Sequence, residues 1–169
     1  MNATSRVLLV ALLCTAAVAC SKKVKEAPPV DTVPPPTTTQ PAADDGLYGP
    51  EDLDTDTCLR QRTIYFDFDQ DTLRPEFQAA MACHAKYLRD RPTSRLVLEG
   101  NADERGSREY NLGLGERRGN AVSSALQANG ASASQLEVVS YGEERPVCTS
   151  SSEDCWARNR RVELNYTSR

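Results

Sequence analysis

The sequence predicts an α/β (α+β) fold in which helices pack on one face of a four-stranded sheet. Two kinds of apolar pattern support this prediction: alternation over short segments, which is typical of strands, and recurrence every three or four residues, which is typical of helices. The segments follow one another in the order β-α-β-α-β-(α)-β between residues 58 and 169. This order is typical of a sheet covered by helices on one face.

Four segments have the character of strands. They are residues 63–68, 95–99, 135–141 and 161–166. The first alternates apolar and polar side chains, which predicts a strand buried on one face. Its buried face carries Ile64, Phe66 and Phe68. The last strand is expected to point Val162, Leu164 and Tyr166 inward.

The first helix is predicted from Pro75, a residue suited to the first helical turn, to the position before Pro92. Its apolar stripe consists of Phe77, Ala80, Met81, His84 and Leu88. The only histidine of the chain, His84, lies on this stripe and is therefore interpreted as a hydrogen-bonded core residue. A short helical turn is expected at residues 153–158, with Trp156 as its apolar anchor.

The longest predicted helix runs from Glu109 to the helix stop at Asn129-Gly130 and has two polar residues on its apolar side. The apolar stripe consists of Tyr110, Leu114, Ala121, Val122, Ala125 and Leu126. Asn111 and Arg118 interrupt it, and a core-facing guanidinium is costly unless it is paired or binds an anion. The expected partner is Asp103, in the loop before the helix. The pattern therefore predicts either a polar ligand pocket or a purely structural buried ion pair.

The charge distribution argues against nucleic acid as a partner. The whole chain has a formal net charge of −4, but residues 58–169 contain 16 Lys and Arg against 16 Asp and Glu. Nucleic-acid binding depends on many phosphate contacts from basic side chains. The acidity of the chain lies in residues 21–57, with eight acidic and three basic side chains.

Residues 1–19 have the pattern of an export leader. The apolar run at residues 7–18 is too short to span a bilayer. The sequence Ala17-Val18-Ala19 before Cys20 resembles a bacterial lipobox, which implies acylation of Cys20 in the mature protein. Leu is more usual at the position of Ala17, so cleavage by an ordinary signal peptidase is the alternative. Ser21 after the lipidated cysteine implies the outer membrane, with the domain in the periplasm.

Residues 20–57 are expected to form the lipidated cysteine and a disordered acidic tether. Seven of the ten prolines fall between residues 21 and 57, and such a segment buries too little apolar surface to fold. Extended at about 3.1 Å per residue, it would reach on the order of 100 Å. The acidic run from Glu51 to Asp56 is interpreted as solvated.

The cysteines of the domain are predicted to form disulfides. Two of the six cysteines belong to the leader, and an even number in the remainder of an exported chain favours disulfides. Cys148 and Cys155 are the favoured pair because they close a short loop, which leaves Cys58 for Cys83. A zinc site is the alternative, but the chain has one histidine and no C-x-x-C spacing.

The stretch GNADERGSREYN followed by LGERRGNAV resembles the signature of the OmpA-like, peptidoglycan-binding domain family. The resemblance extends from Ile64 to Tyr166 and includes YFDFDQDTL, VSYGEERP and NRRVEL. It implies an OmpA-C-like α/β sandwich with a mixed sheet. It also implies a lipoprotein that binds peptidoglycan noncovalently and tethers the outer membrane to the cell wall. The lipoproteins of this family further imply the Tol system, envelope integrity and division, and the periplasmic partner TolB.

The resemblance also implies the ligand, which is the diaminopimelate residue of the peptide stem of peptidoglycan. Asp103 aligns with the family residue that pairs with the side-chain amine of this ligand, and Arg118 aligns with the one that pairs with its carboxylate. Asn111 matches an asparagine near the same pocket. Asp69 and Asp71 match a loop that lines it. Neither a cofactor nor a metal is expected.

Other functions have weaker sequence support. Three glutamates, Glu104, Glu109 and Glu116, lack a nucleophile–base pair, so no enzyme is expected. The glycines at positions 113, 115 and 119 mimic part of a dinucleotide fingerprint but lie inside a predicted helix. Asp69 and Asp71 lack the further ligands of a calcium-binding EF-hand. The alternative function is that of a periplasmic adaptor whose domain binds a protein.

Overall fold

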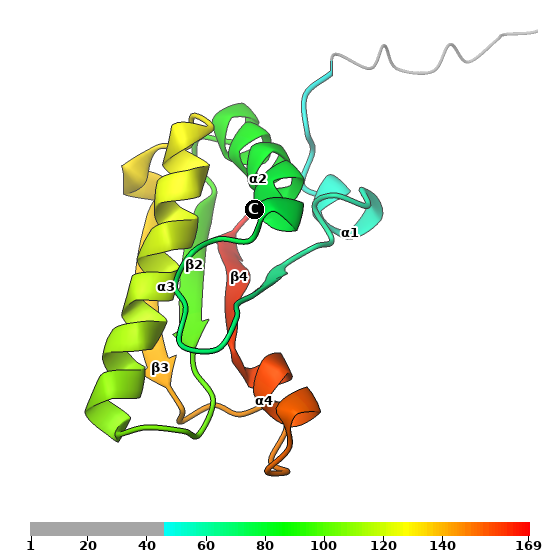
Figure 1. The fold of residues 1–169 in the computed structure, drawn as a ribbon. Helices are drawn as coiled ribbons and strands as arrows, with labels where there is room; N and C mark the ends of the chain where they lie inside the picture. The colour runs from blue at the N-terminus through cyan, green and yellow to red at the C-terminus, as the bar shows by residue number, and fades with distance from the viewer. Residues whose placement is uncertain (1–45) are drawn as a thin grey trace, which may run out of the picture. The chain divides into compact units, whose positions relative to one another are not determined.

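The central feature of the fold is a four-stranded sheet with strand order β1-β4-β2-β3 (Figure 1). The computed structural model describes residues 46–169. The strands are β1 (Thr63–Tyr65), β2 (Arg95–Asn101), β3 (Leu136–Gly142) and β4 (Arg161–Ser168). β2 and β3 are parallel, and β4 runs antiparallel to both β1 and β2. The sheet is therefore mixed, as predicted.

Helices cover one face of this sheet (Figure 1). The described residues form four α-helices, α1 (Asp52–Thr55), α2 (Gln78–Asp90), α3 (Arg108–Ala128) and α4 (Glu153–Asn159), with 3₁₀ turns at Pro75–Phe77 and Ala133–Gln135. α2 and α3 pack on the sheet, and α3 connects the parallel strands β2 and β3. α4 lies beyond the end of the sheet at which β4 begins, remote from α1. The α/β order predicted from the sequence is confirmed.

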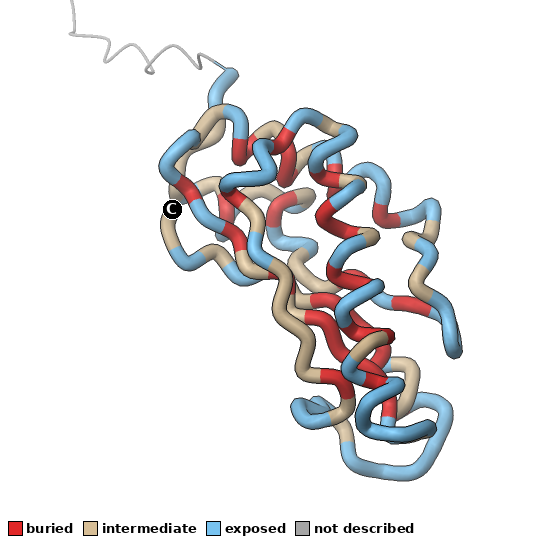
Figure 2. Tube along the Cα trace, turned by 90° about the vertical axis from the view of Figure 1, so that its left-hand side faces the viewer, coloured by how far each residue is buried: buried red, intermediate tan, exposed pale blue. Residues whose placement is uncertain are grey.

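The apolar core fills the space between α2, α3 and the sheet. Its buried side chains include Ile64, Phe66, Met81, Ala85, Leu88, Leu96, Leu98, Val122, Leu126, Val162 and Leu164. Figure 2 shows the buried positions gathered inside the described fold, and along β2 buried residues alternate with less buried ones. Full burial of one such aliphatic side chain contributes about 1.5–3 kcal/mol, so this layer is a main source of stability.

Glycines allow α3 to lie close to the sheet. A Cβ atom at Gly100 in β2 would lie 1.9 Å from the carbonyl oxygen of Gly115 in α3. A Cβ atom at Gly119 would lie 2.5 Å from Cγ1 of Val138 in β3. Real side chains do not approach this closely, so the glycine-rich run serves helix packing rather than phosphate binding.

Two aromatic residues that were predicted to be buried lie at the surface. Phe68 is 55% exposed, because β1 ends at Tyr65 and the chain turns at Asp69, which has a φ of 57°. Tyr110 is 45% exposed. It lies in the first turn of α3, where its hydroxyl donates to the Asp69 carboxylate instead of contacting the core. Both predictions of burial are wrong.

Residues 46–57 belong to the folded part, which begins earlier than the predicted boundary at residue 58. Leu53 in α1 is fully buried and packs against Tyr87 of α2. The backbone N–H of Tyr48 donates to the Asp90 carboxylate at 3.0 Å. The linker-like composition of this segment did not indicate that it packs against α2, because Leu53 is one apolar residue within an acidic run. That run forms a helical turn and is not merely solvated.

The remaining predictions for the N-terminal part concern residues that the structure does not describe. The leader at residues 1–19, the lipidation site Cys20 and the tether up to residue 45 lie outside the described range. They stay predictions. Within residues 46–169, no helix is both long enough and apolar enough to cross a membrane.

Both disulfides favoured by the sequence are present. Cys58 bonds to Cys83 in α2, and Cys148 bonds to Cys155 in α4. In the described part of the chain, no group of three or more His, Cys, Asp or Glu side chains is arranged to hold a metal ion. The four cysteines are therefore engaged with one another rather than in a zinc site.

Loss of the Cys58–Cys83 bond is expected to cost more stability than loss of the Cys148–Cys155 bond. The bonds close loops of 25 and 7 residues in sequence separation. In the chain-entropy model these loops correspond to about 3.5 and about 2.4 kcal/mol at 25 °C. Urea unfolding of the two double Cys→Ser variants, followed by circular dichroism, measures both losses. The reverse order would contradict this expectation.

The only histidine is a hydrogen-bonded core residue, as predicted. His84 is fully buried. Its Nδ1 lies 2.9 Å from the Tyr166 hydroxyl, and its Nε2 lies 3.2 Å from the backbone oxygen of Gln61. A carbonyl oxygen only accepts, so Nε2 carries the proton and Nδ1 accepts from Tyr166. Burial lowers the pKa of His84 from 6.5 to about 4.

Acid is therefore expected to destabilise the fold through His84. The unfolded chain takes up a proton near pH 6.5, whereas the folded chain does so only near pH 4. The contribution of neutral His84 is thus complete above pH 6.5 and is lost as the pH falls toward 4. Between pH 7 and pH 4.5 we expect a loss of about 2 kcal/mol from this residue. Urea unfolding at both pH values measures it, with His84→Gln as a control that lacks this titration. Equal losses in both chains would contradict the assignment.

Candidate functional site

A cavity of about 250 Å³ lies where two loops meet the first half of one helix. Its lining residues are Phe68, Asp69, Asp103, Arg105, Gly106, Tyr110, Asn111, Leu114 and Arg118. They come from the segment after β1, the loop after β2 and the first half of α3. Four of the five predicted binding residues, namely Asp69, Asp103, Asn111 and Arg118, therefore line one cavity. Asp71 is not among them: its carboxylate accepts from Arg117 Nε at 3.1 Å.

Arg118 is the largest fully buried side chain of the described fold. Its guanidinium donates to backbone oxygens of Gln70 at 2.8 Å, Asn101 at 2.9 Å and Asp67 at 3.2 Å. It also lies over the Phe66 ring, 5.3 Å from the centroid. Burial, reinforced by the nearby charge of Arg160, lowers the pKa of Arg118 to about 10. The group still carries its charge at neutral pH.

The predicted ion pair between Asp103 and Arg118 is not formed. Asp103, which is 4% exposed, instead binds Arg105 and Arg160. The Arg105 side chain reaches both carboxylate oxygens, at 3.0 and 2.7 Å, and its backbone N–H donates at 3.0 Å. Arg160 Nη1 lies 3.3 Å away. The prediction is wrong because backbone oxygens, which spacing along the helix does not reveal, satisfy Arg118.

The pKa of Asp103 follows from these contacts. Burial by itself would raise the pKa of its carboxyl group. The hydrogen bonds and charge of Arg105, together with the hydrogen bond from Arg160, outweigh burial and lower the pKa below its ordinary value. Asp103 is therefore ionised at neutral pH and supplies a fixed negative charge to the cavity wall.

Arg105 is held between two aromatic rings while it binds Asp103. Its guanidinium carbon lies 4.0 Å from the centroid of the Phe68 ring and 4.2 Å from that of the Trp156 ring. Glu153 of α4 lies 3.7 Å from Arg105 and accepts from Arg160 Nη2 at 2.7 Å. The short helix α4 thus supports the carboxylate side of the cavity.

Asn111 stabilises the loop that carries Asp103. Its Nδ2 lies within hydrogen-bond distance of the backbone oxygens of Asp103, at 3.1 Å, and Arg105, at 3.2 Å. Glu143, in the loop after β3, accepts from the same nitrogen at 2.5 Å. Asn111 lines the cavity, and its amide holds the loop by bonding to backbone oxygens.

Several residues of the site were not predicted. Arg105, Phe68, Tyr110, Arg160, Glu153 and Trp156 line the cavity or hold its lining residues. Arg105 follows Asp103 by two positions in the loop between β2 and α3, where neither the helical nor the strand period applies. Arg160 and Trp156 come from the far end of the sequence, so only the fold brings them to Asp103.

The charged side chains of the cavity carry both signs. Asp69 and Asp103 contribute carboxylates, whereas Arg105 and Arg118 contribute guanidinium groups. Such a lining complements a zwitterion better than a simple anion or cation, because both ligand charges find a fixed opposite charge. Hydrogen bonds of this charge-assisted kind are short and strong.

Comparisons with known proteins agree with this fold. The model of the OmpA family matches residues 65–160. The peptidoglycan-associated lipoprotein of Pseudomonas putida is 46% identical over 159 residues, which covers 91% of this chain and 92% of that protein. The peptidoglycan-associated lipoprotein of Haemophilus influenzae is 37% identical over 166 residues, which covers 98% of this chain and 100% of that protein.

Solved structures show the same architecture. The crystal structure of the peptidoglycan-associated lipoprotein from Burkholderia pseudomallei has a TM-score of 0.66 at 43% identity, covering 68% of this chain and 98% of that one. The C-terminal domain of Helicobacter pylori MotB has a TM-score of 0.58 at 21% identity, covering 63% and 84%, which shows the fold alone.

These matches assign the chain to a protein family. The relatives carry the name of a lipoprotein associated with peptidoglycan and not that of an enzyme, which confirms the expectation that the chain is not an enzyme. The family model covers more than half of the chain, and the two sequence relatives span nearly all of it. The chain therefore belongs to the OmpA family, and the relatives that it matches are peptidoglycan-associated lipoproteins.

Proposed function

We propose that the chain binds peptidoglycan noncovalently by receiving the side-chain end of diaminopimelate in the cavity. The observation that carries this proposal is that a buried cation, Arg118, and a buried carboxylate, Asp103, both line one cavity of about 250 Å³ without binding each other. The end of the diaminopimelate side chain carries an ammonium and a carboxylate on the same carbon. A ligand with this pair of charges matches the lining.

Arg118 is the proposed carboxylate-binding residue. A guanidinium has five N–H bonds, and three of those of Arg118 donate to backbone oxygens of the described chain. The other two are the proposed donors to the ligand carboxylate. Because backbone oxygens hold the group in place, little side-chain freedom is lost on binding.

Asp103 is the proposed ammonium-binding residue, with Asp69 across the cavity as a second carboxylate. Arg105 occupies both oxygens of Asp103 in this structure. The backbone N–H of Arg105 and Nη1 of Arg160 also donate to this carboxylate, so its four lone-pair sites are all taken. In our proposal the ligand ammonium therefore displaces one of these four donors.

We further propose that Cys20 anchors the protein in the outer membrane and that the domain works in the periplasm. The lipobox resemblance and the names of the relatives support this anchor. TolB, the Tol system and a role in division rest on the family resemblance alone.

Sedimentation with purified peptidoglycan sacculi tests the proposed function. The chain from residue 21 to residue 169 is expected to sediment with diaminopimelate-type sacculi, and a free stem peptide containing diaminopimelate is expected to release it. Sacculi of the lysine type serve as the matched control, because lysine lacks the second carboxylate. A chain that stays in the supernatant with both would contradict the proposal and favour the adaptor function.

A further inference from the structure

We infer that the Cys148–Cys155 disulfide positions the binding site by holding α4 against the carboxylate side of the cavity. The inference rests on the proposed function and adds a positioning element that does not itself touch the ligand. The element consists of residues 148–160, called the clasp below. It contains the disulfide, α4 and Arg160.

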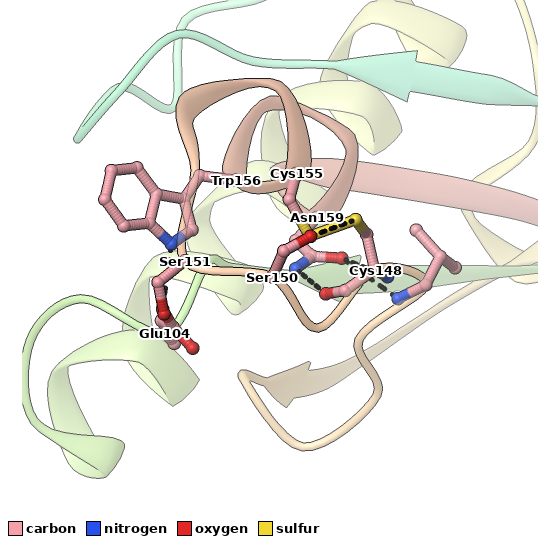
Figure 3. The surroundings of a disulfide bond; sticks show 8 residues. Glu104, Cys148, Ser150, Ser151, Cys155, Trp156 and Asn159 are labelled. Carbon is pink, nitrogen blue, oxygen red and sulfur yellow. Dashed lines mark hydrogen bonds between the residues drawn. A yellow bond between two sulfur atoms is a disulfide. The ribbon is translucent and has the colours of Figure 1, made fainter.

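The clasp needs an external constraint because α4 is short. It has seven residues, and its N-cap residue Ser152 makes no side-chain capping hydrogen bond. Isolated helices shorter than about 12–15 residues are marginal in water. The disulfide attaches this helix at Cys155, which is 2% exposed, to the loop after β3 (Figure 3).

Asn159 at the end of α4 makes a second attachment to the same loop. Its Oδ1 accepts from the backbone N–H of Val147 at 2.9 Å and of Cys148 at 3.2 Å. Its Nδ2 donates to the backbone oxygen of Cys148 at 2.7 Å (Figure 3). The disulfide and Asn159 together fix the orientation of α4 at two points.

The clasp in turn holds Arg105 against Asp103. The Trp156 ring contacts the Arg105 guanidinium at 4.2 Å, and its Nε1 donates to Glu104 at 3.0 Å. Ser151 donates to the same oxygen of Glu104 at 2.8 Å (Figure 3). Two residues of the clasp therefore bind the loop after β2, which carries Asp103. Loss of the disulfide is expected to loosen these contacts. Arg105 and Asp103 would then be held less firmly in their positions at the cavity.

The second disulfide provides a matched control. Cys58–Cys83 joins the segment after α1 to α2, and neither cysteine lines the cavity or touches a residue of the clasp. Its loss should reduce global stability more, because it closes the longer loop, but should leave the site unchanged. The two disulfides thus separate an effect on the site from an effect on stability.

The test compares wild type, the Cys148→Ser/Cys155→Ser variant and the Cys58→Ser/Cys83→Ser variant, all from residue 21 to residue 169. The probe is a stem peptide with diaminopimelate at its third position, and titration calorimetry gives its affinity. Trp156 is the only tryptophan of the chain, so its emission maximum reports the state of the clasp without a ligand. Thermal unfolding of each variant shows that it is folded at the temperature of the titration.

The clasp variant is expected to bind the peptide about tenfold more weakly, which corresponds to the loss of preorganisation at one charged contact. Its Trp156 emission is expected to shift to longer wavelength. The control variant should keep both the affinity and the emission, despite the larger drop in its unfolding temperature. Trp156→Leu, which keeps both disulfides, should weaken binding by a similar factor.

Three outcomes are decisive. Equal affinities of wild type and the clasp variant, with the peptide bound by wild type, would overturn the positioning role alone. Equal weakening in both disulfide variants would show a global effect and would also overturn it. Failure of wild type to bind the peptide would overturn the proposed function and, with it, this inference.

Discussion

Arg118→Met is expected to lower the free energy of unfolding by about 3–5 kcal/mol, the largest effect on stability that we predict. The substitution keeps an unbranched side chain but removes the donors to the backbone oxygens of Asp67, Gln70 and Asn101. A buried acceptor left without a partner costs about 1–3 kcal/mol. These oxygens belong to the loop after β1 and to the last residue of β2, so both segments lose the group that joins them. Urea unfolding measures the loss.

Arg117→Met is the matched control, because Arg117 is the adjacent residue on the same helix. Its side chain is 49% exposed and forms one surface ion pair with Asp71 at 3.1 Å. Exposed pairs of this kind contribute about 0–1 kcal/mol. Similar stability of the Arg117 and Arg118 variants would contradict the structural role assigned to the buried guanidinium.

Asp103→Asn is expected to weaken binding of a diaminopimelate stem peptide by about 100-fold, or about 2.7 kcal/mol. The amide is close in size to the carboxylate, so the cavity keeps its shape. The variant removes the negative charge that pairs with the ligand ammonium, and it leaves Arg105 and Arg160 without their shared carboxylate. Titration calorimetry at neutral pH gives the two affinities.

The control for this substitution is Asp71→Asn. Asp71 lies in the same family-derived set of candidates but outside the cavity lining, where it binds exposed Arg117. We expect its affinity to stay within about twofold of that of wild type, because an exposed pair contributes little. An Asp103→Asn variant that binds as tightly as wild type would exclude Asp103 as the ammonium-binding residue.

Much of the fold could be predicted because its elements have regular periods. β2, β3 and β4 fall at the expected segments, and the apolar stripe of α2 is buried throughout. Phe68 departs from the pattern because β1 stops after three residues, and the turn at Asp69 then carries the ring to the cavity rim. α1 was missed because one buried side chain, Leu53, has no periodic neighbours.

The site was predictable in its members but not in its pairings. The family signature named Asp103 and Arg118, and a cation on an apolar stripe marked Arg118 independently. Neither signal showed that backbone oxygens would satisfy Arg118 or that Arg105 and Arg160 would hold Asp103. Arg118 reaches Gln70 and Asp67, and Arg160 reaches Asp103, from more than forty positions away in the sequence. Arg105 binds Asp103 through the conformation of a loop, which has no period.

The central claim is that the cavity recognises both charges at the end of diaminopimelate. Titration of the chain, from residue 21 to residue 169, with two stem peptides that differ only at the third residue tests it most directly. Lysine keeps the ammonium but lacks the carboxylate proposed to bind Arg118. We predict that the diaminopimelate peptide binds at least about 100-fold more tightly, because the buried guanidinium otherwise stays without its anion. Equal affinity for the two peptides would contradict the claim.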